Sequence, residues 1–147
     1  MSASRKMLDR INDDVDFYEH QVLGVREMAK MSSFILADEM GLGKSLQALT
    51  VAAIDVERDW AKRILIIAPS FLKWNWGEEI DAMTSYSYTI YHGTPKQREK
   101  IREDFDSDIL ITNYEQIVND HDGTISVNSR PGRTEFTIQL PTGATHE

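Results

Sequence analysis

The stretch from residue 33 to residue 45, read as SFILADEMGLGKS, constrains the fold of this chain more than any other. Residues 33–37 are a short apolar run of the kind found in strands, and a loop with two glycines, a lysine and a serine follows. Beyond the loop, apolar residues recur at helical period: Leu46, Leu49, Ala53, Val56 and Trp60. A strand, a glycine-rich loop, Lys-Ser and a helix are together the context that a phosphate-binding loop requires.

The loop residues have the chemistry that phosphate binding needs. Gly41 and Gly43 lack a Cβ, so the backbone can curl and bring its N–H groups close to an anion. The helix expected to start near Lys44 adds unsatisfied N–H groups and the positive end of its dipole. Lys44, the catalytic candidate, is suited to neutralise the β- and γ-phosphates of ATP, and Ser45 to place a hydroxyl on Mg²⁺. The predicted phosphate site comprises Asp38, Glu39, Met40, Gly41, Leu42, Gly43, Lys44 and Ser45.

One position departs from the strict phosphate-loop pattern, which has glycine where this chain has Asp38. On the pattern alone, the alternative is a tight turn between a strand and a core helix. However, ADEMGLGKS resembles the first helicase motif of the Swi/Snf-type ATPases, the superfamily-two DNA translocases and chromatin remodellers. In that family the acidic pair Asp38-Glu39 is the usual form, so the departure supports the resemblance.

A glutamine upstream of the loop fits the same family. We expect a helix over residues 17–31, with one apolar side formed by Tyr18, Val22, Val25 and Ala29. Gln21 in this helix matches, by resemblance, the glutamine with which the family reads the adenine edge. An amide suits that task because it can pair with a donor and an acceptor of adenine together. The alternative is a glutamine that faces solvent on the helix surface.

The composition narrows the class of protein. At 147 residues a single domain is the expectation, and the lack of cysteine excludes disulfides and thiolate metal sites. No apolar run approaches the ~20 residues that a membrane helix needs, and the N-terminus lacks the apolar region of a secretory signal. We therefore expect a cytoplasmic protein, or one located wherever its DNA is. The net charge of −8 argues against strong DNA affinity without excluding a DNA-binding face.

Further apolar runs predict the rest of a sheet. Residues 63–68 suit a parallel strand covered on both faces, and residues 88–91 and 108–112 suit two more strands. Strands alternating with helices predict an α/β fold, a doubly wound and mostly parallel sheet that is RecA-like by resemblance. Such folds bind ligands at the carboxyl edge of the sheet, where the loop is expected.

A helix over residues 96–105 carries a basic cluster that we interpret as a solvated face: Lys96, Arg98, Lys100 and Arg102.

Two segments after these strands resemble family motifs that face DNA. APSFLKWNWGEEI resembles the motif at which a strand end and a helix start face the DNA backbone, which makes Ser70 and Lys73 candidate phosphate contacts. ITNYEQI resembles the segment from which a contact to the tracked strand is expected, with Thr112 and Tyr114 as candidates. The resemblance covers about residues 17–118 and implies duplex DNA as a partner, bound weakly by this chain in isolation.

Most of the hydrolytic machinery of the family is missing from these residues. No strand is followed by Asp-Glu-x-His, and the Asp38-Glu39 pair precedes the phosphate loop, so it cannot serve instead. The second lobe of the family, with its arginine fingers, is also absent. We therefore expect binding of Mg-ATP with little or no hydrolysis by this chain alone. The alternative is an α/β folding or interaction module that does not bind nucleotide.

The tail has a different character. Ile125 and Val127 alternate with polar residues, as do Phe136, Ile138 and Leu140, and a Pro-Gly pair between the two runs favours a turn, which predicts an antiparallel β-hairpin. Residues 117–141 resemble the C-terminal end of a sensor histidine kinase ATP-binding domain. A kinase-related protein would also need an Asp-x-Gly box and an upstream Asn-rich helix, and neither is present.

These patterns divide the chain into three parts. We expect a flexible segment over residues 1–16, a RecA-like ATP-binding lobe fragment over 17–118 and the hairpin tail over 119–147. A join near residues 115–118 suggests a chimera, natural or engineered. The hairpin is expected to cover a sheet edge left exposed by missing strands. Exposed edges also favour a homodimer without specifying one.

Overall fold

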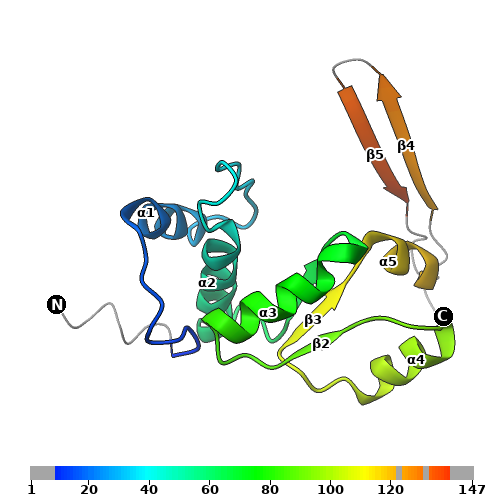
Figure 1. Ribbon diagram of the computed structural model, residues 1–147, viewed down its shortest axis with the longest axis horizontal. Helices are drawn as coiled ribbons and strands as arrows, with labels where there is room; N and C mark the ends of the chain where they lie inside the picture. The colour runs from blue at the N-terminus through cyan, green and yellow to red at the C-terminus, as the bar shows by residue number, and fades with distance from the viewer. Residues whose placement is uncertain (1–8, 122–123, 131–132, 140–147) are drawn as a thin grey trace, which may run out of the picture.

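The computed structural model describes residues 9–121, 124–130 and 133–139 (Figure 1). Within them lies a three-stranded parallel sheet. The strands β1 (Ile64–Ile67), β2 (Tyr88–Ile90) and β3 (Ile109–Thr112) lie in the order β1-β3-β2. Helices α3 (Lys73–Met83) and α4 (Pro95–Asp104) lie in the connections between them. Parallel neighbours require such crossover connections, so the predicted α/β class is confirmed.

The core lies between this sheet and two helices. Central strand β3 contributes Ile109 and Ile111, which are both fully buried. Leu49 and Ala53 of α2 (Lys44–Glu57) and Ile80 of α3 belong to the same cluster. Leu49 and Ala53 belong to the apolar face that the helical period predicted, so the sequence identified the core side of α2 at these two positions.

The strand expected over residues 33–37 is not formed. Residues 34–39 have no regular secondary structure, and Ile35 is 93% exposed. An extended segment becomes a strand only when a neighbouring strand takes up its backbone hydrogen bonds, and within the described residues no strand pairs with it. Trp60, expected on the buried face of α2, is also exposed because that helix ends at Glu57.

Strand β1 is covered less than its sequence predicts. The run was expected to be buried on both faces, but Leu65 and Ile67 are 55% and 41% exposed while Ile64 and Ile66 pack against the core. β1 is an edge strand, since β3 is its only hydrogen-bonded neighbour among the described strands. One face of β1 and its outer edge are therefore open.

The buried side of α1 (Glu19–Met28) also differs from the prediction. Gln21, Val25 and Met28 are buried, whereas Tyr18 and Val22 of the predicted apolar side are exposed. Val25 and Met28 form a second small cluster with Val51 of α2. The helix therefore lies against α2 and brings its first turn close to the start of that helix.

Part of the N-terminal segment is anchored. Of residues 1–16, expected to be flexible, residues 1–8 lie outside the described part of the chain. Ile11 forms an isolated antiparallel bridge with Thr84 and packs into the core with only 8% of its surface exposed. This contact ties the chain before α1 to the end of α3.

The tail forms a sheet of its own. After β3 and α5 (Tyr114–Asp120), β4 (Thr124–Arg130) pairs antiparallel with β5 (Arg133–Gln139), and the predicted turn residues 131–132 lie outside the described part. Figure 1 shows these two strands projecting away from the parallel sheet. The expectation that they cover an exposed edge of the parallel sheet is therefore wrong.

No helix among the described residues is long and apolar enough to cross a membrane.

Candidate functional site

The predicted phosphate loop adopts the backbone that its glycines were expected to allow. Gly41 and Gly43 have φ values of 83° and 72°, in the left-handed region where a side chain would strain the backbone. Gly43 is the N-cap of α2, which begins at Lys44 as predicted. The loop therefore ends directly at the free N–H groups of a helix N-terminus.

Lys44 folds back over this loop. Its ammonium donates to the backbone oxygens of Asp38, at 2.9 Å, and Glu39, at 2.8 Å. Both acceptors lie only five or six residues before the lysine, so its charge is held by its own loop. The two acidic side chains leave that charge unpaired, since among the described residues neither forms an ion pair with Lys44.

A glutamine that the sequence did not single out holds the first acidic residue. Gln47, fully buried one turn into α2, donates from Nε2 to Oδ2 of Asp38 at 2.9 Å. The only available signal was its position three residues after Lys44, which places both on neighbouring parts of the helix surface. The first turn of α2 thus contacts the loop through both Lys44 and Gln47.

Gln21 lies against the same loop and does not face solvent. It is 3% exposed; its Oε1 accepts from the Tyr18 N–H at 2.9 Å, and its Nε2 donates to the Leu42 oxygen at 3.2 Å. A Cβ added to Gly43 would lie 2.2 Å from that Nε2, so glycine is needed there for space as well as for φ. The solvent-facing alternative for Gln21 is wrong, and the structure brings its amide to the loop.

The other predicted loop residues lie at the surface or are half-buried. Met40 is 95% exposed and Leu42 is 41% exposed, so both reach the site through their backbone. Glu39 is exposed, and Ser45 is half-buried in the first turn of α2. The groups with which this loop could contact phosphate are therefore its backbone N–H groups, the Lys44 ammonium and the Ser45 hydroxyl.

The four candidate DNA contacts fall into two groups at the carboxyl edge of the sheet. Ser70, in the short 3-10 helix η2 (Ser70–Leu72), and Tyr114, at the start of α5, are exposed. Lys73 and Thr112 are buried, with 5% and 2% of their surface exposed. The structure therefore does not place the side chains of Lys73 and Thr112 where a nucleic acid can reach them.

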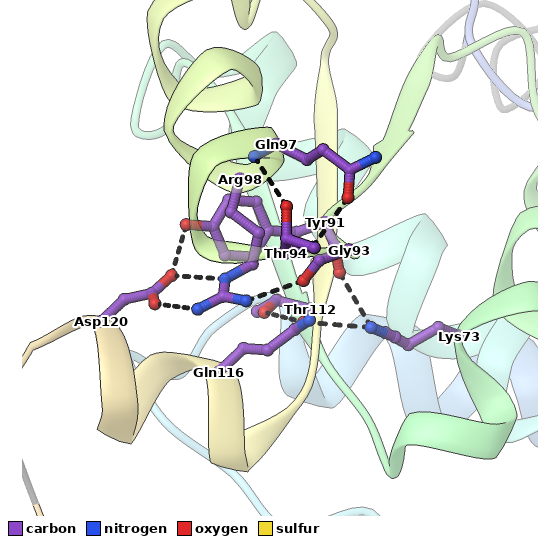
Figure 2. A network of polar contacts seen from close by, with 9 residues as sticks. All are labelled: Lys73, Tyr91, Gly93, Thr94, Gln97, Arg98, Thr112, Gln116 and Asp120. Atoms are coloured by element: carbon purple, nitrogen blue, oxygen red, sulfur yellow. Dashed lines mark hydrogen bonds and ion pairs between the residues drawn. The ribbon is translucent and has the colours of Figure 1, made fainter.

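Lys73 instead joins three elements from within (Figure 2). Its ammonium donates to the Tyr91 oxygen, after β2, at 2.8 Å and to Oε1 of Gln116, in α5, at 3.0 Å. Burial lowers the pKa of Lys73, although the carboxylate of Glu115 opposes this effect. A buried ammonium with two acceptors is a structural tie between the start of α3, the end of β2 and α5.

A second tie joins α4 to α5 in the same network, and it takes Arg98 out of the basic cluster expected to face solvent. Lys96, Lys100 and Arg102 are exposed as predicted. Arg98 donates to both carboxylate oxygens of Asp120, at 2.6 Å and 3.1 Å, and to the Gly93 oxygen at 2.8 Å. The Tyr91 hydroxyl also donates to Asp120 (Figure 2). The hydrogen bonds from Arg98 lower the pKa of Asp120 from 3.8 to about 2.

Comparisons with known proteins show the family to which this chain is similar. Residues 18–133 match the SNF2-related domain, so the match extends past residue 118, where the resemblance was expected to end. In Danio rerio, the SWI/SNF-related matrix-associated actin-dependent regulator of chromatin subfamily A containing DEAD/H box 1A is 31% identical over 126 residues. That match covers 78% of this chain and 13% of the relative.

Two further relatives support the same assignment. Nuclear protein STH1/NPS1 of Saccharomyces cerevisiae is 34% identical over 112 residues, which is 69% of this chain and 8% of that protein. The Sulfolobus solfataricus SWI2/SNF2 ATPase core, solved in complex with dsDNA, is 30% identical with a TM-score of 0.64. That match covers 80% of this chain and 25% of the solved one, so this chain spans only a small part of its relatives. The chain belongs to the SNF2-related domain family, as a fragment of a Swi/Snf-type ATPase domain.

Proposed function

We propose that this chain binds Mg-ATP through residues 38–45, as the N-terminal ATP-binding lobe of a Swi/Snf-type DNA translocase. The observation that carries the proposal is the loop itself. Gly43 caps α2 in the left-handed conformation, and Lys44 folds back over the loop that leads to the helix. A helix N-terminus behind a glycine loop with a lysine at its mouth is a site for phosphate groups.

The residues present fit Mg²⁺ bound together with ATP better than Mg²⁺ bound alone. Among the described residues no group of three His, Cys, Asp or Glu side chains could hold a metal ion. Mg²⁺ commonly takes one or two protein ligands and completes its shell with water and substrate phosphates. The Ser45 hydroxyl, in the first turn of α2, is the protein ligand that we assign to it.

Gln21 is the residue that we assign to adenine. Its amide already lies beside the loop through the Leu42 oxygen, so a nucleotide whose phosphates occupy the loop has this amide within its surroundings. Adenine would take over one of the two hydrogen bonds that the amide now makes to Leu42 and the Tyr18 N–H.

We further propose that these residues alone support little or no hydrolysis. The 147 residues contain no Asp-Glu-x-His sequence, which in the resembled family supplies the Mg²⁺-holding carboxylate and the group that polarises water. An arginine finger from a second lobe is worth roughly 10³–10⁵ in rate in related enzymes. A turnover rate above background that disappears in Lys44→Ala would refute this part of the proposal.

Calorimetric titration with ATP in the presence and absence of Mg²⁺ tests the binding proposal. The wild-type chain should bind Mg-ATP at micromolar strength, and Lys44→Ala should abolish the binding. Lys62→Ala, which removes the same charge from an exposed position outside the loop, should not change it. No binding by a wild-type chain that melts cooperatively would favour the alternative of an interaction module.

Duplex DNA is the second partner that we propose, since the solved relative was obtained in complex with dsDNA. Ser70 and Tyr114 are exposed where the chain leaves β1 and β3. The acidic net charge predicts weak binding that falls steeply with salt. Ser70→Glu should weaken the binding at least fivefold, whereas Ser85→Glu, at another exposed serine, should leave it unchanged.

Two further proposals concern the assembly of the chain. We propose that the tail was joined to the lobe near residues 115–118, because β4 and β5 pair with each other and not with the parallel sheet. The family match through residue 133 overlaps this tail, so a sequence comparison restricted to residues 119–147 is the direct test. We also propose a homodimer through the open edge of β1, which light scattering over a range of concentrations would detect.

A further inference from the structure

The phosphate loop presents an electrostatic problem. Asp38 and Glu39 place two negative side chains in the loop that we propose binds a triphosphate. Like charges a few ångströms apart repel strongly in the partly dehydrated surroundings of a binding site. If the loop binds nucleotide as proposed above, it must accommodate these carboxylates close to the phosphates.

The lysine of the loop does not neutralise either of them. Lys44 donates to the backbone oxygens of Asp38 and Glu39, at 2.9 Å and 2.8 Å. Within the described part of the chain, no ion pair joins its ammonium to either carboxylate. The positive charge of Lys44 therefore stays available to phosphate oxygens, and another group must hold the carboxylates.

Gln47 holds the carboxylate of Asp38. Its Nε2 donates to Asp38 Oδ2 at 2.9 Å, and only the NH₂ end of an amide can make this hydrogen bond. The side chain is fully buried, so its orientation is fixed by its neighbours. Among the described residues its Oε1 has no hydrogen-bond partner, which means that the amide is oriented for Asp38 at a cost in free energy.

Gly24 of α1 makes room for this orientation. A Cβ added at Gly24 would lie 2.3 Å from Oε1 of Gln47. Any other residue at this position would push the Gln47 amide out of its place between α1 and the loop. Two helices thus cooperate to keep one amide directed at one carboxylate.

We propose that Gln47 is a positioning residue of the nucleotide site, which holds the Asp38 carboxylate toward α2 and away from the phosphates. The loop then offers backbone N–H groups and Lys44 to the nucleotide, and the charge of Asp38 opposes binding only weakly. Glu39 is exposed, so solvent screens its charge without such a partner.

Calorimetric titration with Mg-ATP of four variants tests this role. Gln47→Met keeps the volume of the side chain but loses the donor, and it should weaken the affinity about tenfold because the carboxylate is released. In an Asp38→Asn background the same substitution should cost less than about twofold, since no charge is left to release. Glu39→Gln, which removes a charge from the neighbouring exposed residue, should not rescue Gln47→Met.

The outcomes are distinguishable. A wild-type chain that binds no Mg-ATP would overturn the proposed function and this inference together. If the wild type binds and Gln47→Met loses equal affinity in both backgrounds, Gln47 only packs the helix and the inference is wrong. Asp38→Asn alone provides a measurement that needs no substitution at Gln47. It should tighten binding by about twofold, and a gain beyond tenfold would show that the carboxylate already faces the phosphates.

Discussion

The pairing of Arg98 with Asp120 should contribute measurably to stability, because both side chains are largely buried. Only 12% and 14% of their side-chain surfaces are exposed, and two hydrogen bonds join the guanidinium to the carboxylate. The hydrogen bonds from Arg98 lower the pKa of Asp120 from 3.8 to about 2. At about 1.4 kcal/mol per pKa unit, this difference corresponds to about 2 kcal/mol of folding free energy at neutral pH.

The sign of the pH dependence follows from the direction of this change. The folded chain binds the proton of Asp120 more weakly than the unfolded chain does, so ionisation of Asp120 stabilises the fold. The contribution is fully present above the unfolded pKa of 3.8 and is lost as the pH falls through about 2. Asp108 adds acid sensitivity of the same sign: burial raises its pKa, but hydrogen bonds from Ser87 and the charge of Arg10 more than offset this.

A double-mutant cycle with Arg98→Met and Asp120→Asn isolates the pair. Urea unfolding followed by tryptophan fluorescence at pH 7 should give a coupling of about 1–2 kcal/mol, because the Tyr91 hydroxyl and the charge of Arg102 also lower the pKa of Asp120. Each single variant should lose at least about 1 kcal/mol of unfolding free energy, since it leaves one largely buried polar group without its partner. The exposed pair of Glu27 and Lys30, at 2.7 Å on the surface of α1, is the matched control and should give at most about 0.5 kcal/mol.

Two results would refute the reasoning. A coupling below about 0.5 kcal/mol would show that solvent screens the pair as it screens the control. Equal loss of stability between pH 5 and pH 2.5 in the wild type and in Asp120→Asn would show that the Asp120 carboxyl has no lowered pKa in the fold. The expected result is a shallower loss in the variant, with the remaining slope due to Asp108 and other acids.

One further substitution and one deletion test the fold outside this network. Gly77→Ala should destabilise the chain by about 1–3 kcal/mol in urea unfolding, because the new Cβ would lie 2.8 Å from the Tyr88 ring; a loss below about 0.5 kcal/mol would mean that the ring moves freely. Deleting residues 124–147 should change the melting temperature by less than about 2 °C, since β4 and β5 pair only with each other among the described strands. A drop above 5 °C would show that the tail supports the lobe.

Local signals in the sequence predicted the features that depend on local chemistry. The left-handed backbone of Gly41 and Gly43 and the start of α2 at Lys44 follow from the backbone freedom of glycine and from helix-terminal chemistry, and the structure has both. The three strands follow from apolar runs of the length that a parallel sheet buries. Features that depend on distant neighbours were missed. The run at residues 33–37 forms no strand because none of the described strands pairs with it, and β1 is open on one face.

Charged residues show the same limit. Arg98 lies in a helix whose sequence is typical of a solvated surface, and its partner Asp120 is 22 residues away. Lys73 lies within a motif that faces DNA in the resembled family, but its acceptor Gln116 is 43 residues away. Neither partner can be identified from spacing along the chain, since the two contacts arise only when α4 and the start of α3 pack against α5 beside the end of the sheet.

The hydrogen-bond partners of the two lysines explain why one suits a ligand and the other does not. Lys44 is held by two oxygens of its own loop, five and six residues back, so a local loop movement can exchange them for phosphate oxygens. Lys73 is held by an oxygen after β2 and a side chain in α5, so its release would separate elements that the core holds together. A lysine whose acceptors are local can bind an anion at small structural cost, whereas one whose acceptors come from distant elements acts as part of the fold. On this ground Lys44, and not Lys73, is the one of these two lysines that we propose to contact phosphate.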